Sequence, residues 1–339
     1  MTEHERSTGF GDVTEADLRE VFEAEDYVAD EGIVTTVLLA LRLGKPLLIE
    51  GQPGAGKTEL AKVLAGGFDT ELIRLQCYEG LAAENALYEW NYTKQLLSVQ
   101  AGEDGVGDGE SVFDEEYLFE RPLLRALGRE GDDDGTGDAG SAGDGTDPET
   151  AGRPPVLLID EVDRADEEFE ALLLEVLSDF QVSVPELGTV RAETPPVVVI
   201  TSNRTRGLSD ALKRRCLYLH VEPPSFEKER AILERKVPEL DGAVAAEICG
   251  AVQRLREEPF LKQPGAAETI DWARAVAQLR HDGEPDSLSA TEVRTTLGCL
   301  LKEVEDVQRV DDDLLSALLE SAEQARHAVE ESEEAEAEG

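Results

Sequence analysis

One eight-residue segment constrains the fold of this chain more than any other. It reads GQPGAGKT, from Gly51 to Thr58, and satisfies the pattern G-x-x-x-x-G-K-[ST]. A short apolar run, PLLIE at 46–50, precedes it, and an amphipathic segment with helical spacing, TELAKVLAGGF at 58–68, follows it. Strand, glycine-rich loop and helix is the order in which this pattern binds nucleotide phosphates. The segment therefore predicts a P-loop on a parallel α/β sheet.

Each part of this loop has a predicted task. Glycines let the backbone wrap around phosphates, so that the N–H groups from about Gly54 to Thr58 point at them. The Lys57 ammonium would neutralise the β- and γ-phosphates of ATP, and the Thr58 hydroxyl would ligate Mg²⁺. The candidate nucleotide-binding residues are Gly51, Gln52, Pro53, Gly54, Ala55, Gly56, Lys57 and Thr58.

A second motif, VLLIDE at 156–161, supplies carboxylates. An apolar strand that ends in Asp160 places this side chain at the carboxyl edge of the sheet, beside the phosphate loop, where it can hold the Mg²⁺ shell. Glu161 can accept a proton from the attacking water. An Asp-Glu pair after a strand can also be a simple helix N-cap, but the P-loop upstream favours the catalytic interpretation.

Two further candidates follow the strand VVVITSN at 197–203. Asn203 ends that strand and is predicted to orient the water, although a plain turn residue is the alternative. In DALKRRC, Arg214 and Arg215 form a positive cluster on an acidic protein, which could be a surface ion pair. We prefer an arginine finger that reaches into the site of a neighbouring subunit.

The chain divides into regions by pattern. Continuous apolar strands alternating with helices predict an α/β fold with a parallel sheet covered on both faces, and after His220-Val-Glu-Pro-Pro only helices are expected. Helical spacing is expected without a break from Glu15 to Gly44, at 115–127, and roughly at 226–237, 241–257, 267–280, 290–306 and 311–329. A hairpin with its turn near 186–188 is expected at 181–193. The predicted regions are a polar lead-in at 1–15, a nucleotide-binding domain at 16–223 with a disordered acidic insert at about 130–152, a helical domain at 224–329 and an acidic tail at 330–339.

The net charge of the chain bears on which classes of partner it can bind. The net charge is −43, from 75 acidic and 32 basic residues spread along the whole chain. We interpret it as adaptation to a salt-rich cytoplasm, with an acidic surface for a basic partner as the alternative. Either interpretation disfavours general binding to phosphate backbones. No apolar run is long enough for a membrane span and no signal peptide is evident, and the four scattered cysteines fit free thiols rather than a metal site.

Taken together, the segments GQPGAGKT, LLIDEVDRAD, QVSVPELGTV, VVVITSNRT and LSDALKRRC resemble the MoxR family of AAA+ ATPases, with most similarity to its CoxD-like branch. The resemblance covers roughly residues 20–330. It implies a ring, usually a hexamer, with ATP at subunit interfaces and a helical lid. It also implies that Val28 lines the adenine site, that Arg215 rather than Arg214 is the finger, and that 77–97 and 181–193 face the pore or substrate. Ala267 stands where many relatives have a sensing arginine, which Arg274 could replace.

The resemblance favours Mg²⁺-dependent ATP hydrolysis that remodels or activates a protein client. The client would be a metalloenzyme, assisted by a separate chain with a von Willebrand-type domain. Two alternatives remain open at this point. One is a motor or loader on nucleic acid, which the charge and the lack of a basic, aromatic-bearing stripe disfavour. The other is a GTP-specific motor, although the N-K-x-D guanine motif is missing.

Overall fold

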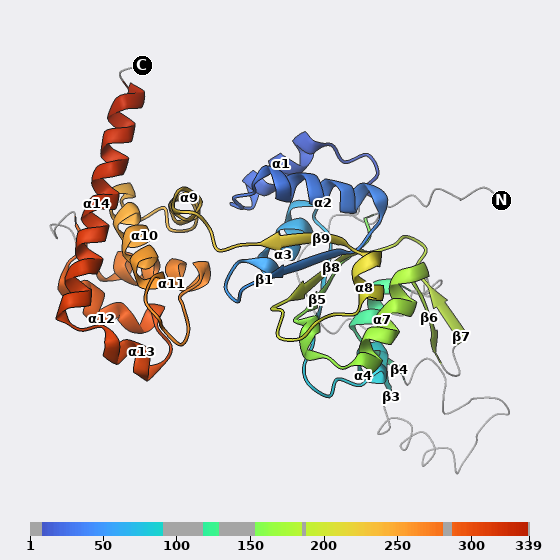
Figure 1. Cartoon of the computed structure of the whole chain (residues 1–339). Coiled ribbons are helices and arrows are strands. Elements are labelled where there is room, and N and C mark those ends of the chain that lie inside the picture. The colour runs from blue at the N-terminus through green and yellow to red at the C-terminus, as the bar shows by residue number, and fades with distance from the viewer. Residues whose placement is uncertain (1–8, 91–117, 129–152, 185–187, 281–286, 338–339) are drawn as a thin grey trace, which may run out of the picture. The chain divides into compact units, whose positions relative to one another are not determined.

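The computed structural model describes residues 9–90, 118–128, 153–184, 188–280 and 287–337 (Figure 1). The chain forms two compact units. The sheet unit comprises Met1–Glu25, Ala29–Glu50 and Thr58–His220, and the helical unit comprises Asp26–Val28, Gly51–Lys57 and Val221–Gly339. Residues 51–57, the first of which ends strand β1, thus group with the helical unit.

The sheet is parallel and has five strands in the order β2-β5-β8-β1-β9. Their bounds are β1 Leu47–Gly51, β2 Leu72–Gln76, β5 Val156–Asp160, β8 Val197–Ser202 and β9 Leu217–Val221. The inner strands β1 and β5 are buried at every position, whereas β2 at one edge alternates between buried and exposed side chains. Continuous burial of the inner strands is the pattern of a parallel sheet covered on both faces, and it confirms the predicted fold class.

Helices lie on both faces of this sheet (Figure 1). On one face are α2 Glu31–Leu43 and α3 Lys57–Gly67, and on the other are α7 Glu167–Asp179 and α8 Asp210–Arg215. The apolar side of α7, with Phe169 and Leu173, shares one core cluster with strand residues such as Leu157 and Ile200. This packing fixes the carboxyl ends of the strands, where the candidate residues lie.

The predicted continuous helix from Glu15 to Gly44 is wrong. It is two helices, α1 Glu15–Ala24 and α2, separated by a short loop. In that loop Asp26 has a left-handed backbone (φ 52°), and the Asp30 side chain accepts a hydrogen bond from the N–H of Ile33. An aspartate that satisfies a free N–H in this way starts a new helix, which the apolar spacing alone does not reveal.

The predicted helix at 115–127 is also partly wrong. Leu118–Glu120 forms strand β4, which pairs antiparallel with β3, Tyr88–Trp90, and the helix α6 covers only Pro122–Leu127. Arg121 is extended (φ −91°, ψ 169°) because the ring of the following proline disfavours a helical backbone before it. Proline is well accommodated at the first helical position, so the helix begins there.

The predicted hairpin at 181–193 is confirmed in its two arms. Strands β6 Gln181–Val184 and β7 Gly188–Arg191 pair antiparallel, with Gln181 opposite Arg191 and Val184 opposite Gly188. The turn residues 185–187 lie outside the described residues, as do the predicted acidic insert at 130–152 and residues 91–97 of the segment at 77–97.

The helical unit carries α9 Phe226–Lys236, α10 Gly242–Arg256, α11 Ala266–Leu279, α12 Ala290–Leu300, α13 Val304–Arg309 and α14 Asp312–Ala337. Its core includes the fully buried Trp272, which donates to Thr296 Oγ1 at 2.7 Å. In the part of the chain that the structure describes, no helix is long and apolar enough to cross a membrane.

Two helix predictions in this unit need correction. The single helix expected at 290–306 is two helices, because Leu301 is extended (φ −102°, ψ 126°) and buries its side chain together with Leu300. Helix α14 runs past residue 329 to Ala337, so most of the predicted acidic tail is helical. Glutamate and alanine are strong helix formers, and the Arg326–Glu330 ion pair at 2.8 Å supports this end.

Candidate functional site

The glycine-rich loop has the backbone that its sequence requires. Gly54 and Gly56 have φ values of 79° and 84°, in the left-handed region where only glycine is unstrained. At Gly51 a Cβ atom would come within 2.2 Å of the Val221 carbonyl oxygen, so no other residue fits there without movement. Three of the loop glycines are thus explained by geometry, and the loop leads from the end of β1 into the first turn of α3.

Lys57 is held inside the curve of this loop. Its side chain is nearly buried, with 7% exposed, and its ammonium donates to the carbonyls of Gly51 at 2.9 Å and Gln52 at 2.7 Å. Within the same helical unit, the Gly54 carbonyl accepts the N–H of Ala266, the first residue of α11, at 3.2 Å. A buried ammonium on a loop of turned backbone is suited to an anionic ligand.

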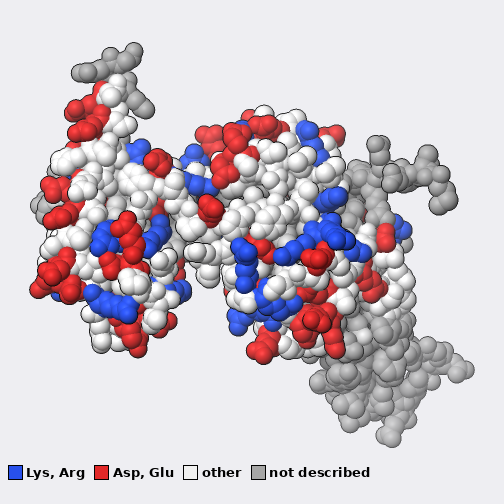
Figure 2. Space-filling view, in the orientation of Figure 1, with Lys and Arg blue, Asp and Glu red and all other residues white. Residues whose placement is uncertain are grey.

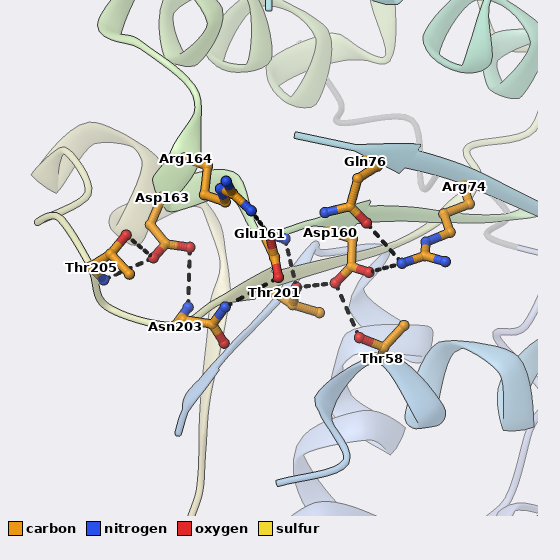
Figure 3. A network of polar contacts seen from close by, with 10 residues as sticks. All are labelled: Thr58, Arg74, Gln76, Asp160, Glu161, Asp163, Arg164, Thr201, Asn203 and Thr205. Atoms are coloured by element: carbon orange, nitrogen blue, oxygen red, sulfur yellow. Dashed lines mark hydrogen bonds and ion pairs between the residues drawn. The ribbon is translucent and has the colours of Figure 1, made fainter. Parts of the chain in front are cut away.

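Asp160 links the start of α3 to two strands (Figure 3). It is the last residue of β5 and only 4% exposed. Its Oδ1 accepts from the Thr58 hydroxyl at 3.1 Å and from the Thr201 hydroxyl, on β8, at 2.6 Å. Its Oδ2 accepts from Arg74 Nη2, on β2, at 2.6 Å. Both oxygens of this carboxylate therefore have defined partners, two on Oδ1 and one on Oδ2.

The oxygen donors at this point fit Mg²⁺. A hydroxyl and a carboxylate oxygen lie 3.1 Å apart at the head of the P-loop helix. Mg²⁺ prefers oxygen ligands and commonly takes only one or two from a protein, with the rest from phosphates and water. Among the described residues no group of three or more His, Cys, Asp or Glu side chains could hold a metal ion.

Glu161 and Asn203 meet at the next position along the sheet edge (Figure 3). Glu161 has a left-handed backbone (φ 55°, ψ 49°), a conformation that costs a non-glycine residue about 1–2 kcal/mol. Its N–H donates to Thr201 Oγ1 at 2.9 Å, which fixes the strained backbone. Its carboxylate pairs with Arg164 at 3.1 Å and accepts a long hydrogen bond, 3.4 Å, from Asn203 Nδ2. The side chain stays 31% exposed, so water can reach it.

A buried carboxylate that the sequence reasoning missed positions Asn203. Asp163 accepts from the N–H of Asn203 at 3.1 Å, and from the N–H and hydroxyl of Thr205 at 2.8 and 2.6 Å. Burial raises the pKa of Asp163, but the hydrogen bonds from Thr205 and Asn203 outweigh it and hold the pKa below its usual value. Asp163 is therefore an anion that pins the loop carrying Asn203.

A second missed carboxylate lies directly before the P-loop. Glu50, 4% exposed, accepts from the Tyr218 hydroxyl at 3.1 Å and faces Arg204 Nε at 3.5 Å and Lys213 Nζ at 3.8 Å. The pKa of Tyr218 is raised, because the phenol is partly desolvated and its hydroxyl donates a hydrogen bond to Glu50. Glu50 thus joins β1 to the loop after Asn203 and to α8.

The two candidate finger arginines differ in their surroundings. Both are exposed on the last turn of α8. Arg215 donates to Ser178 Oγ on α7 at 3.0 Å and to the Ala211 carbonyl at 3.2 Å. The side chain of Arg214 makes no hydrogen bond or ion pair to any other residue that the structure describes.

Of the predicted site residues, the structure joins Thr58, Asp160, Glu161 and Asn203 in one hydrogen-bonded network through Thr201. Neither Val28 nor Arg215 forms a hydrogen bond to this network within the described ranges.

Val28 is half-buried in the loop between α1 and α2 and belongs, like the P-loop residues 51–57, to the helical unit. On α11, both Ala267 and Arg274 are exposed. Of the missed residues, Arg74 stands in no motif, whereas Asp163 and Thr205 lie within the quoted segments LLIDEVDRAD and VVVITSNRT but were given no role. Thr201 could have been noted as the buried hydroxyl two residues before Asn203.

Comparison with known proteins matches this region to one family. The model of the AAA domain (dynein-related subfamily) covers residues 46–216, half of the chain. An uncharacterized protein of Staphylococcus haemolyticus, SH1500, is 24% identical over 258 residues, covering 74% of this chain and 82% of that protein. Among solved structures, the RuvB Holliday junction branch migration motor of Thermotoga maritima is 17% identical, covering 91% of this chain and 76% of that chain, with a TM-score of 0.41.

Proposed function

This chain belongs to the AAA domain family, dynein-related subfamily, and we propose that it is a Mg²⁺-dependent ATPase that remodels or activates a protein client. The observation that supports the ATPase most strongly is the carboxylate of Asp160, which links Thr58 at the head of the P-loop helix to Thr201 on the strand before Asn203. Thr58, which is proposed to hold Mg²⁺, is thereby linked to the strand that leads to the proposed water-orienting Asn203.

Each residue of the candidate site has its own role in the proposed ATP hydrolysis. Mg²⁺, when bound, supplies positive charge to the β- and γ-phosphates. Lys57 would exchange its bonds to the loop carbonyls for bonds to these phosphates, and the glycine-rich backbone would donate its N–H groups. Thr58 and Asp160 would hold the metal. Because the exchange replaces neutral acceptors with anionic ones, it favours the bound state.

Glu161 is the proposed base. Its carboxylate accepts only a weak hydrogen bond from Asn203 and an exposed ion pair with Arg164, so acceptor capacity remains for a water. Asn203, held by Asp163, would keep the amide aimed at that water. A base that accepts the proton of attacking water contributes about 10²–10⁴-fold to a rate.

We further propose a ring, hexameric in the simplest case, in which Arg215 acts on the ATP of a neighbouring subunit. The bonds to Ser178 and Ala211 give Arg215 a defined direction, whereas the exposed Arg214 is the alternative finger. Val28 would contact the adenine, and Arg274 would replace the sensing arginine that Ala267 does not provide. Residues 224–329 would serve as the lid, as in the MoxR family.

The proposed client is a protein. Hairpin β6–β7 directly follows α7 and precedes β8, the strand that leads to Asn203, so a change at the nucleotide can move it. Basic side chains stand among the acidic ones on both units in the face that Figure 2 shows. The net charge of −43 nevertheless opposes binding to a phosphate backbone. A CoxD-like role would make the client a metalloenzyme, with a von Willebrand-type chain as its partner in a salt-rich cytoplasm.

One experiment tests both halves of this proposal. ATP binding and phosphate release are measured at high salt for the wild type, for Lys57→Ala, and for the control Lys62→Ala, whose exposed ammonium pairs with Glu59 on the same helix. Lys57→Ala should lose nucleotide binding because the counter-charge to the phosphates is gone, and the control should match the wild type. A Lys57→Ala protein that still binds and hydrolyses ATP at the wild-type rate contradicts the assigned site.

The same three proteins then serve as bait in the native cytosol with ATP. The wild type and Lys62→Ala should capture a metalloenzyme or a von Willebrand-type chain, and Lys57→Ala should not. Recovery of nucleic acid without such a protein rules out the client half and leaves the ATPase half standing.

A further inference from the structure

The guanidinium of Arg74 lies on the carboxylate that is proposed to hold Mg²⁺ (Figure 3). Its Nη2 donates to Asp160 Oδ2 at 2.6 Å and to Gln76 Oε1 at 2.7 Å. The arginine side chain is half exposed (52%), whereas that of Asp160 is 6% exposed. Asp160 therefore has a permanent positive partner that reaches it from the edge strand β2.

The two oxygens of Asp160 are divided between two kinds of partner. Oδ1 takes the neutral hydroxyls of Thr58 and Thr201, on the side of the P-loop helix. Oδ2 takes the charged guanidinium. Because the carboxylate charge is delocalised over both oxygens, Arg74 lowers the negative potential at Oδ1 without occupying it.

From this arrangement we infer that Arg74 is a positioning residue which weakens the attraction of Asp160 for a divalent cation, so that Mg²⁺ binds together with a nucleotide and not before it. A nearly buried carboxylate beside a hydroxyl, without a cation of its own, would be a local centre of negative charge in a chain of net charge −43. Arg74 compensates that charge, and the phosphates then restore the affinity for the metal. The inference rests on the proposed nucleotide site.

The geometry argues against a merely structural ion pair. Arg74 stands on an edge strand with an alternating pattern, and its exposed half gives little to the core. Gln76, two residues along the same strand and on the same side, holds the guanidinium at its angle to Asp160. Without Arg74 the Asp160 carboxylate keeps the hydroxyls of Thr58 and Thr201, so the fold of Arg74→Gln should stay intact, which unfolding curves check.

Calorimetric titration of the full chain with ADP, with and without MgCl₂, tests the inference. The measured quantity is the factor by which Mg²⁺ tightens ADP binding. In Arg74→Gln this factor should rise roughly five- to tenfold over the wild type, because one nearby positive charge is removed. Arg74→Lys, which restores the charge, should return most of the way to the wild-type factor.

The matched control is Arg125→Gln. Arg125 pairs with Glu71 next to the opposite end of β2, so its removal changes the net charge equally but leaves Asp160 untouched. An Arg74→Gln factor within twofold of the wild type overturns the inference, as does an equal rise in the control. A wild type that binds no ADP contradicts the proposed function instead, so the two failures are distinguishable.

Discussion

The two units bury carboxylates in different settings. In the sheet unit Asp160 is the last residue of a strand, Glu50 is the next-to-last residue of another, and Asp163 follows a strand, so all three lie near the loops at the sheet edge. In the helical unit the buried Glu229 and Glu247 lie on helices and meet other helices or the segments leading into them. Burial is nearly complete in both settings. Burial alone therefore does not distinguish a carboxylate of the candidate nucleotide site from one that only holds the fold together.

The partners make the distinction. Arg256 donates to both oxygens of Glu229, at 2.8 and 2.7 Å, and the Thr269 hydroxyl adds a third bond at 2.8 Å, so α9, α10 and α11 are joined by a fully occupied carboxylate. Glu161, in contrast, holds one exposed ion pair and one bond of 3.4 Å. The sheet edge keeps acceptor capacity for a ligand, and the helical core does not. This difference predicts which substitutions change stability and which change chemistry.

The largest stability effect is expected at Glu229. Glu229→Ala leaves the guanidinium of Arg256 inside the helical unit without its carboxylate and should lower the free energy of unfolding by about 3 kcal/mol. The control Glu234→Ala, on the same helix with an exposed pair to Arg230, should cost less than about 1 kcal/mol. Guanidinium denaturation of the full chain measures both.

A double variant sharpens the test. Glu229→Leu with Arg256→Met removes both charges and keeps the volume, so its stability should lie closer to the wild type than that of Glu229→Ala. If Glu229→Ala lowers the free energy of unfolding no more than Glu234→Ala does, the Glu229 carboxylate does not hold the helices together, and the comparison between the units fails.

A smaller stability effect, coupled to chemistry, is expected at Asp163. Asp163→Asn turns one acceptor oxygen into an N–H₂ group facing the donors of Asn203 and Thr205, which should cost about 2 kcal/mol and also slow ATP hydrolysis. Asp166→Asn is the control, because asparagine replaces aspartate well at the start of α7. Unfolding curves and phosphate release are measured on the same samples.

The stability that Asp163 contributes should depend on pH, and the direction of this dependence follows from its pKa. The folded pKa of Asp163 is lower than its ordinary value of 3.8, so the stability it contributes is complete above that value. It is lost as the pH falls through 3.8 toward the folded pKa, because the unfolded chain takes up the proton first. Asp163→Asn should therefore lose less stability than the wild type over this acid range, and an equal loss contradicts the role assigned to Asp163.

The sequence predicted the parts of the site that follow from strand order. Asp160 ends a buried apolar strand, Asn203 directly follows one, and Thr58 follows one through the P-loop. Parallel strands bring their carboxyl ends to one edge. Arg74 could not be found this way, because it lies within the alternating edge strand LIRLQ and its role depends on the neighbouring strand. Asp163 and Thr205 meet across two loops, which no spacing along the chain records.

The helix errors have a similar cause. Apolar spacing continues across Asp26–Asp30 and across Leu301, and local capping or the burial of two adjacent leucines breaks the helix there. At Arg121 the signal was present in the following proline but was outweighed by the apolar pattern. Periodicity therefore located the elements more reliably than their ends.

The most direct test of the ATPase site is a single-turnover measurement on Glu161→Gln. Substitution by an amide keeps the size of the side chain and removes only its capacity to accept a proton. The variant should bind ATP as the wild type does and hydrolyse it at least about 100-fold more slowly. Glu168→Gln, an exposed change in the first turn of α7, should hydrolyse at the wild-type rate. Wild-type hydrolysis by Glu161→Gln would contradict the account.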